Sequence, residues 1–176
     1  YKRQYPTKPI RLFVGAPAGG PTDVIARSLI QQMGDSLGQP VIVENRGGAA
    51  GTLAAGIVAK SPADGYTLIV TPSAHAYAAS MYDKLPFDPV KDFRPVGQIG
   101  MMPLVAIANK AFPAGSLRDL VERAKAQPTA VNYGSSGTGS AHHLAGELFK
   151  LRTGIQMTHV PYKGSCLLYT SPSPRD

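Results

Sequence analysis

The sequence predicts an α/β protein with largely parallel β-sheets, and two observations support this prediction. Short apolar runs alternate with segments whose apolar residues recur at helical spacing, which is the pattern of consecutive strand-helix-strand units. Loops with glycine, serine or threonine follow several of the apolar runs, as is typical where a strand leads into a helix. With 43% hydrophobic and 16% charged residues over 176 positions, the composition indicates a globular protein rather than a disordered or fibrous one.

The first part of the chain is predicted to form three strands separated by two helices. A buried strand is expected at residues 10–14 (IRLFV), followed by a helix at residues 24–38. That helix carries apolar residues on one face at four-residue steps: Ile25, Leu29, Met33 and Leu37. Gly38 is expected to end the helix, because glycine favours the left-handed conformation found after a helix C-terminus. The remaining predicted elements are a strand at 40–45, a helix at 51–61 with Thr52 as a possible cap, and a strand at 66–71.

A second α/β part is predicted after a proline-rich connection at residues 82–97. Strand character resumes at residues 103–108 (PLVAIA), which places a domain crossover near Gly100. Ser116 and Asp119 have the spacing of a capping box and are expected to begin a helix. That helix carries the apolar residues Leu117, Leu120, Val121 and Ala124. The next elements are a strand at 130–135, a glycine-rich turn at 137–140, a helix at 141–154 with Leu144, Leu148 and Leu151 inward, and a strand at 156–162.

The last residues, 166–176 (CLLYTSPSPRD), break this pattern. They have no helical or strand periodicity, and they match an in-frame translation of a commonly used transposase sequencing adapter. We therefore expect the natural sequence to be recorded only as far as Ser165, the alternative being a genuine proline-rich tail. The expected organisation is a first α/β domain at 1–100, part of a second at 101–165, and an adapter-derived tail.

Charge and cysteine content argue against several classes of function. The formal net charge is +7, but the basic residues are scattered and are not interleaved with aromatic residues, so no nucleic-acid partner is expected. The single cysteine, Cys166, excludes an internal disulfide and a thiolate metal cluster. No run reaches the ~18 apolar residues that a membrane-spanning helix requires. The chain begins at Tyr1, and no signal peptide is visible in it.

Three loops that follow predicted strands are candidates for a binding site. They are residues 16–23 (APAGGPTD), 71–75 (TPSAH) and 134–143 (GSSGTGSAHH). Ligands of open α/β sheets bind at the carboxyl ends of the strands, so these loops could face one ligand. Thr22 and Ser140 are natural N-cap residues, and the amides that follow them are suited to an anion. The alternative is that the glycines only form tight turns and the hydroxyls only cap helices.

Common nucleotide-binding motifs are absent. Glu44 ends the second predicted strand, where the ribose-binding acid of a dinucleotide fold lies, but Gly15, Gly19 and Gly20 do not form GxGxxG. No Lys-Ser or Lys-Thr pair follows the glycines, as a Walker loop requires. No nucleotide cofactor is therefore predicted.

Catalytic and metal-binding motifs are absent as well. Ser135 and Ser136 do not lie in GxSxG, and there is no SxxK. His143 and Glu147 lie four residues apart on one predicted helix and could share a metal, but HExxH is missing. The isolated histidines are expected to cap or pack: His75, His142 and His159. Asp23 is explained by the helix dipole, with contact to a ligand amine as the alternative. We predict no catalytic residue, no metal and no cofactor.

Several blocks of sequence, in one order, resemble the substrate-binding proteins of tripartite tricarboxylate transporters, the Bug or TctC-like receptors. The resemblance runs from about Tyr5 to Ser165. Its blocks are YPTKPIRLFVGAPAGGPTDVIAR, LGQPVIVENRGGAAG, VAKSPADGYTL, YDKLPFDPVKDFRPV, NYGSSGTGSAHHLAGELFK and HVPYKGS.

The resemblance implies a periplasmic-binding-protein fold of type II, with two α/β domains and a central cleft, incomplete in this chain. Such a receptor is periplasmic, captures a small carboxylate (a di- or tricarboxylate, an amino acid or an aromatic acid) by hinge closure, and delivers it to membrane permease subunits. A sensor protein is a further possible partner, and the runner-up is a small α/β enzyme acting on a carboxylate or nucleotide. Because the family's chain is longer, we expect these 176 residues to be marginally stable and to bind ligand poorly or not at all.

The resemblance also implies which residues contact the ligand. In the family, loop amides, hydroxyls and bridging waters hold the ligand carboxylates. The matching positions are Ala18, Gly19, Gly20, Thr22 and Asp23 in the first loop, Ser73, Ala74 and His75 in the second, and Ser135, Ser136, Gly137, Thr138, Gly139, Ser140 and His143 in the third.

Overall fold

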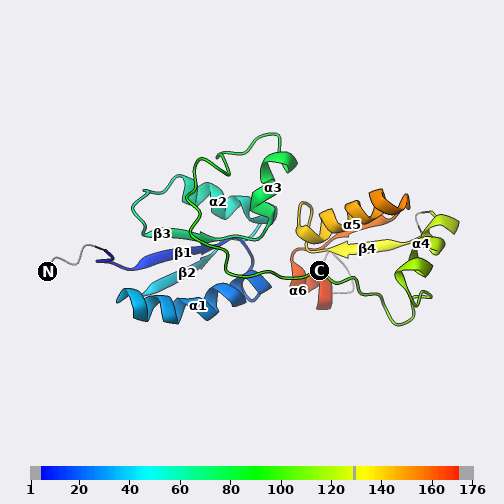
Figure 1. Cartoon of the computed structure of the whole chain (residues 1–176), viewed down its shortest axis with the longest axis horizontal. Coiled ribbons are helices and arrows are strands. Elements are labelled where there is room, and N and C mark those ends of the chain that lie inside the picture. Colours follow the sequence, from blue (N-terminus) through cyan, green and yellow to red (C-terminus); the bar gives the residue numbers. More distant parts are fainter. Residues whose placement is uncertain (1–4, 129, 171–176) are drawn as a thin grey trace. The chain divides into compact units, whose positions relative to one another are not determined.

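The computed structural model describes residues 5–128 and 130–170, which belong to two compact units, Tyr1–Ile99 and Gly100–Asp176 (Figure 1). Each unit contains a parallel sheet whose strands are connected through helices. No helix in the described part of the chain is both long and apolar enough to cross a membrane.

The first unit is built on a three-stranded parallel sheet in the order β2-β1-β3. Its strands are β1 (Ile10–Val14), β2 (Val41–Asn45) and β3 (Thr67–Val70). The middle strand β1 pairs on both sides, with Leu12 opposite Val43 of β2 and Leu68 of β3. A strand enclosed in this way reads as a continuous apolar run, which is why this one was recognisable in the sequence.

Helices cover both faces of this sheet. In Figure 1, α1 (Pro21–Leu37) lies on one face, and α2 (Thr52–Ala59) and α3 (Ala74–Met81) lie on the other, with the short helix η1 (Ala49–Gly51) before α2. One buried cluster forms between α1 and the sheet from Leu12, Val14 and Ala26. Gly38 adopts the left-handed conformation after α1, as predicted.

Two helix starts in this unit differ from the prediction. The N-cap of α1 is Gly20 rather than Thr22, because Pro21 is suited to the first helical position and leaves the cap to the residue before it. The N-cap of α2 is Gly51, and Thr52 is the first helical residue, with its hydroxyl donating to the carbonyl of Ala49. Helix α3 was not predicted, since its alanine-rich sequence gives little amphipathic periodicity.

The strand predicted at residues 103–108 is wrong. Residues 93–109 form neither helix nor strand, and apolar side chains here are exposed, including Val96, Met101 and Val105. A strand persists only when its backbone groups pair with a neighbour. No strand pairs with residues 103–108 in the described part of the chain, so apolar composition alone does not make them a strand.

The second unit contains two parallel strands, β4 (Asn132–Ser135) and β5 (Thr158–Pro161), connected by α5 (Ala141–Thr153). Helix α4 (Leu117–Ala126) precedes them, and Ser116 caps it by accepting from the amide of Asp119, as predicted. The buried core comprises Ala124, Val131, Ile155 and Met157, with Phe112, Leu120, Val121, Tyr133 and Phe149 packed around it.

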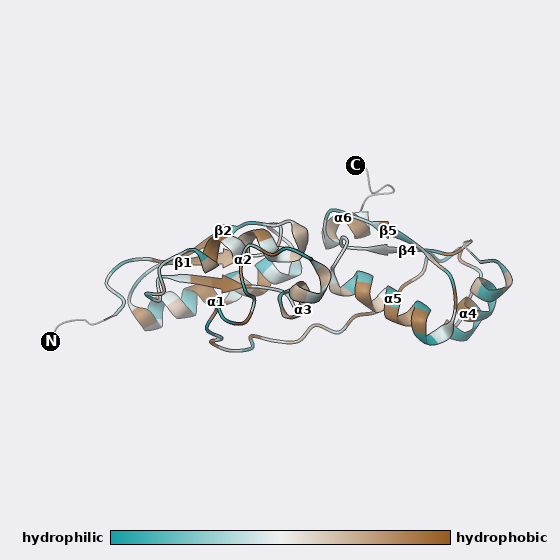
Figure 2. Ribbon diagram, turned by 90° about the horizontal axis from the view of Figure 1, so that it is seen from above, coloured by the Kyte–Doolittle hydropathy of each residue, from teal (hydrophilic) through white to brown (hydrophobic). Residues whose placement is uncertain are grey.

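Helix α5 packs through a different face from the one predicted. Its ribbon contains several hydrophobic segments (Figure 2), yet Leu148 and Leu151 are 53% and 79% exposed. The face turned to the sheet includes Gly146, where an added Cβ would overlap the Tyr133 ring. Glycine therefore lets α5 approach β4 closely, and leucine spacing alone could not identify this face.

The predicted lack of helical structure in the tail is wrong for the described residues. Helix α6 spans Ser165–Thr170 and packs against β4, where Leu168 lies over Gly134. The rest of the predicted tail, residues 171–176, lies outside the described residues.

The close approach at Gly146 predicts the effect of one methyl group. We expect Gly146→Ala to destabilise the protein by about 1–3 kcal/mol, because the Tyr133 ring or helix α5 must move. Urea unfolding followed by circular dichroism measures this. Gly34→Ala in α1 is the matched control, since a Cβ there would meet only Gln39 O at 3.4 Å and helix propensity favours alanine. Equal stability of the two variants would contradict the packing described here.

Candidate functional site

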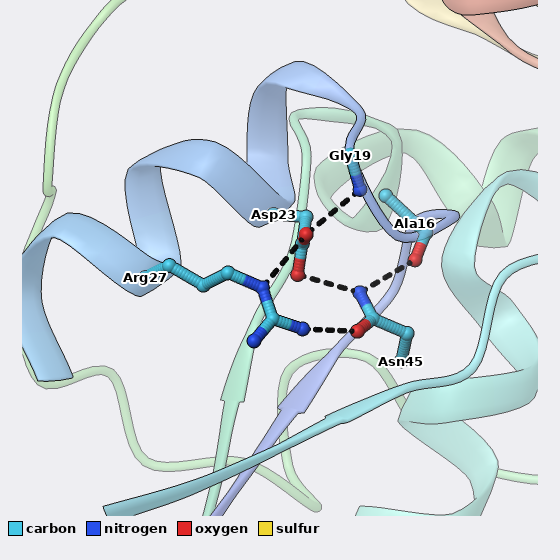
Figure 3. Close-up of polar contacts among 5 residues, drawn as sticks. All are labelled: Ala16, Gly19, Asp23, Arg27 and Asn45. Carbon is cyan, nitrogen blue, oxygen red and sulfur yellow. Dashed lines mark hydrogen bonds and ion pairs between the residues drawn. The ribbon is translucent and has the colours of Figure 1, made fainter.

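The first loop is held by the carboxylate of Asp23, in the first turn of α1 (Figure 3). Gly19 donates its backbone N–H to Asp23 Oδ2 over 2.8 Å, and Arg27 Nε donates to the same oxygen over 2.9 Å. Asn45 Nδ2 donates to Asp23 Oδ1 over 2.8 Å and lies 3.2 Å from the carbonyl oxygen of Ala16, which also accepts from it. Arg27 Nη2 donates to Asn45 Oδ1 over 3.0 Å, which closes the network.

Asp23 is buried, at 2% exposure, and remains charged. The Arg27 guanidinium, together with donation from Gly19 and Asn45, outweighs the cost of burial and lowers the pKa of Asp23 to about 2. The predicted site residue Asp23 thus has its carboxylate engaged by the protein's own donors. Arg27 and Asn45 were not predicted; only the four-residue spacing of Asp23 and Arg27 on one helix was visible in the sequence.

The start of α1 supplies hydrogen-bond donors beside this network. The first turn of a helix leaves backbone N–H groups without intrahelical acceptors, and at α1 these belong to Thr22 and Asp23, since Pro21 has none. The amide of Gly20 donates to the carbonyl of Pro17 over 3.2 Å. Anions are stabilised at such a position by the amides and the helix dipole.

The second loop begins α3, and its histidine packs against the following connection. Ser73 is the N-cap residue of α3, although its hydroxyl makes no capping bond. His75 Nε2 lies 3.0 Å from the carbonyl oxygen of Pro89, so Nε2 carries a proton and donates. The ring stacks on Phe87 and meets Phe93 edge-on, with centroids 6.1 and 4.7 Å apart. The arrangement agrees with a packing role for His75.

The third loop joins β4 to α5 in the second unit. Ser140 caps α5 by accepting from the amide of His143 over 3.3 Å, as predicted. His143 Nδ1 in turn accepts from the amide of Gly139 over 3.1 Å. Ser136 Oγ lies 2.8 Å from His142 Nδ1. Burial lowers the pKa of His142, which favours its neutral form.

Aromatic and charged side chains lie behind this loop, between β4, β5 and α5. The His159 ring stacks on both His143 and Tyr133, with centroids 4.0 and 5.0 Å away. Tyr133 donates its hydroxyl to Glu147 Oε1 over 2.6 Å, and Lys150 Nζ lies 2.9 Å from both Glu147 oxygens. Apart from the Glu147–Lys150 pair on α5, these contacts join residues distant in sequence.

The ionisation of this group follows from its surroundings. Burial and the adjacent His143 lower the pKa of His159, while burial and Glu147 raise the pKa of Tyr133. Donation from Tyr133 and then Lys150 lowers the pKa of Glu147. Glu147 therefore serves as a hydrogen-bond acceptor, and no cluster of three or more potential metal ligands occurs among the residues that the structure describes.

The predicted site residues fall at the carboxyl ends of strands. Loops 16–23 and 71–75 follow the neighbouring parallel strands β1 and β3, so they lie at one edge of the first sheet. Loop 134–143 follows β4 in the second unit. Both α/β units thus present a glycine-rich loop and a helix start at a strand end.

Comparison with known proteins identifies the class. Residues 25–168 match the profile of the tripartite tricarboxylate transporter family receptor, TctC. The chain is 44% identical over 163 residues to BugT of Bordetella pertussis, covering 92% of this chain and 50% of BugT. It is also similar to a solved R. palustris protein with adipate, with TM-score 0.78 and 39% identity. A third similar protein is MatC of Rhodopseudomonas palustris with bound malate, with TM-score 0.79 and 34% identity.

The fold is that of periplasmic binding proteins. The chain belongs to the TctC, or Bug, family of these receptors, which confirms the predicted family and fold class. Each match to the R. palustris structures covers 92% of this chain but only 55% of the R. palustris chain. The chain spans about half the length of the curated relatives it matches.

The buried network predicts the effect of removing the charge of Asp23. We expect Asp23→Asn to lower the free energy of unfolding by about 2 kcal/mol at pH 7. Arg27 loses its ion-pair partner, and an amide NH2 group, which only donates, replaces one carboxylate oxygen that accepts hydrogen bonds. Urea unfolding at several pH values measures this. Since the folded state lowers the pKa of Asp23 from 3.8 to about 2, the difference from wild type should shrink as pH falls through that interval. Asp35→Asn, an exposed change on the same helix, should stay within about 0.5 kcal/mol of wild type.

The lowered pKa values of His142 and His159 predict loss of stability in mild acid. Each histidine has a pKa near 6.5 in the unfolded chain and a lower pKa in the folded protein. Above pH 6.5 the contribution of each histidine to stability is fully present. As the pH falls below 6.5 toward the folded-state pKa, the unfolded chain takes up protons that the folded protein does not, so the free energy of unfolding falls. Urea unfolding between about pH 7.5 and 5.5, the range in which histidine titrates, measures the slope of the unfolding free energy against pH. The double variant His142→Asn, His159→Gln should show a flatter slope; an unchanged slope would contradict this assignment.

Proposed function

We propose that the full-length protein carrying this chain is a periplasmic receptor that captures a small carboxylate and delivers it to membrane permease subunits. The observation that carries the proposal is the pair of loop-to-helix junctions, at α1 and α5, in a chain of the TctC family. Relatives solved with adipate and with malate support the carboxylate class.

The chemistry of the loops suits an anion. At the start of α1, the amides of Thr22 and Asp23 point away from the helix, and those of Ala141 and His142 do so at α5. Bonds from such donors to a carboxylate are charge-assisted and need no lysine or arginine. Asp23 is a nearby negative charge, but Arg27 forms an ion pair with it at 2.9 Å. The first loop therefore carries no unbalanced negative charge that would repel a carboxylate.

We assign the ligand contacts to the three loops, with a division of roles. Gly19, Asp23, Ser135 and His143 have groups already bound within the protein, and we propose that they shape the loops. We propose that the ligand is contacted by the other predicted residues: Ala18, Gly20, Thr22, Ser73, Ala74, Ser136, Gly137, Thr138, Gly139 and Ser140. The backbone N–H groups of Gly20, Gly137, Gly139 and Ser140 are bound within the protein, so these four are not assigned as the amide donors to the ligand. His75 belongs with the residues that shape the loops, because its Nε2 donates to the carbonyl of Pro89.

The remaining parts of the proposal concern the whole protein. We propose that it acts as a receptor without catalysing a reaction, that the two compact units are its two domains, and that the closed, loaded form is what the permease recognises. A sensor protein could read the same form.

The test is a screen of the full-length protein against malate, adipate, other carboxylates and nucleotides, by thermal shift and calorimetry. A carboxylate at 100 times its Kd should add about 2.7 kcal/mol of stability, with no product formed. Thr138→Val should weaken that binding about tenfold by removing an exposed loop hydroxyl, whereas Thr153→Val at the far end of α5 should not. Turnover of a ligand, or stabilisation by nucleotides alone, would favour the enzyme and contradict the receptor.

A further inference from the structure

Ser135 has a fully buried side chain at the end of β4, where the third loop begins. Its exposure is 0%, so its hydroxyl does not face solvent. Ser135 Oγ accepts from the amide of Gly137 over 3.1 Å and lies 3.1 Å from the carbonyl oxygen of the same residue. Its third neighbour is His159 Nε2, at 2.6 Å. A hydroxyl has one proton and two lone pairs, so these contacts engage it completely.

The strand register brings His159 to this hydroxyl. Tyr133 of β4 lies opposite His159 of β5, and Ser135 is two residues further along β4, on the same face of the sheet. Helix α5 packs against both strands, and its His143 stacks on the His159 ring. The imidazole is thus in stacking contact with two rings, Tyr133 and His143, and its Nε2 lies 2.6 Å from Ser135 Oγ.

The conformation of the third loop at Gly137 depends on the position of the Ser135 hydroxyl. Gly137 has φ +129°, a conformation that side chains disfavour, and Ser135 contacts both its N–H and its C=O. The same Gly137 carbonyl accepts from the amide of Ser140, the cap of α5. A displacement of Ser135 would therefore reach the residues that begin the helix.

We propose that His159 is a positioning residue, which acts through Ser135 to hold the Gly137 turn and so positions the third loop and the start of α5 for contact with the ligand. The carboxylate ligand in this statement rests on the proposed function, but the hold on the turn does not and can be measured without ligand. His159 was predicted only as an isolated packing histidine, and its contact with Ser135 gives it a further role.

The surroundings of His159 keep its ring neutral. The titratable groups that face it are Tyr133 on β4 and His143, Glu147 and Lys150 on α5. Burial and His143 lower its pKa, with a smaller opposing effect of Glu147. A neutral ring leaves Nε2 able to accept from Ser135 or to donate to it. An imidazolium can only donate, which would turn the serine proton toward Gly137.

The experiment replaces His159 in the full-length protein and compares two readouts. Gln places its amide nitrogen near the position of Nε2, whereas Phe preserves the stacked ring and removes the nitrogen. The first readout is amide hydrogen exchange at Gly137 without ligand, referenced to Leu120 in α4 as a measure of overall stability. The second is the affinity for malate and adipate by calorimetry. Ser135→Ala removes the other partner of the same contact, the hydroxyl of Ser135.

We expect His159→Phe and Ser135→Ala to speed exchange at Gly137 about tenfold relative to Leu120, and His159→Gln to stay near wild type. The affinity for malate and adipate should fall in His159→Phe and Ser135→Ala and stay near the wild-type value in His159→Gln. Unchanged Gly137 exchange in His159→Phe would overturn the proposal, as would weaker binding without faster exchange, or a Gln variant no better than Phe. Faster exchange restored by Gln, in a wild-type protein that binds no carboxylate, would support the positioning role and contradict the proposed function instead.

Discussion

The buried carboxylate of Asp23 is the interaction on which the first loop depends. Burying a charged group costs several kcal/mol unless partners replace its water, and here three partners do so. Gly19 belongs to the loop, Arg27 to α1 and Asn45 to the end of β2, so one carboxylate ties together three segments. The Asp23 carboxylate holds the first loop in its conformation, and the Arg27 guanidinium balances the negative charge of that carboxylate.

In the second unit, a hydroxyl and an imidazole, rather than a carboxylate, hold the third loop. The loop after β4 is organised by the hydroxyl of Ser135 and the imidazole of His159, and the amide of Gly139 is fixed by His143. Tyr133, in turn, donates to the carboxylate of Glu147 behind the loop, which is paired with Lys150. In both units the groups that define the loop are thus satisfied internally, which leaves the helix-start amides to a ligand.

Sequence patterns predicted the elements that depend on local chemistry. The apolar run Ile10–Val14, the Ser116 cap and the Ser140 cap all follow from spacing along a few residues, and the structure confirms each. Thr22 failed as a cap because its neighbour Pro21 takes the first helical position.

Features that depend on distant pairing could not be predicted in this way. Residues 103–108 have strand composition, but a strand also needs a partner, which no local pattern reveals. The contact of His159 with Ser135 joins residues 24 apart through strand register, and Asn45 meets Asp23 across 22 residues. Leu148 on α5 matched a helical stripe, yet the packed face was decided by a close approach to Tyr133. The family resemblance supplied the site residues that spacing alone left undecided.

The central claim is that backbone donors at the helix starts bind a carboxylate while Asp23 remains engaged within the protein. A crystal structure of the full-length protein with malate tests it most directly. The account predicts malate oxygens within hydrogen-bonding distance of amides at the start of α1 or α5, with Asp23 still bonded to Arg27 and Asn45. Malate bound away from both helix starts, or Asp23 released from Arg27 to contact the ligand, would contradict it.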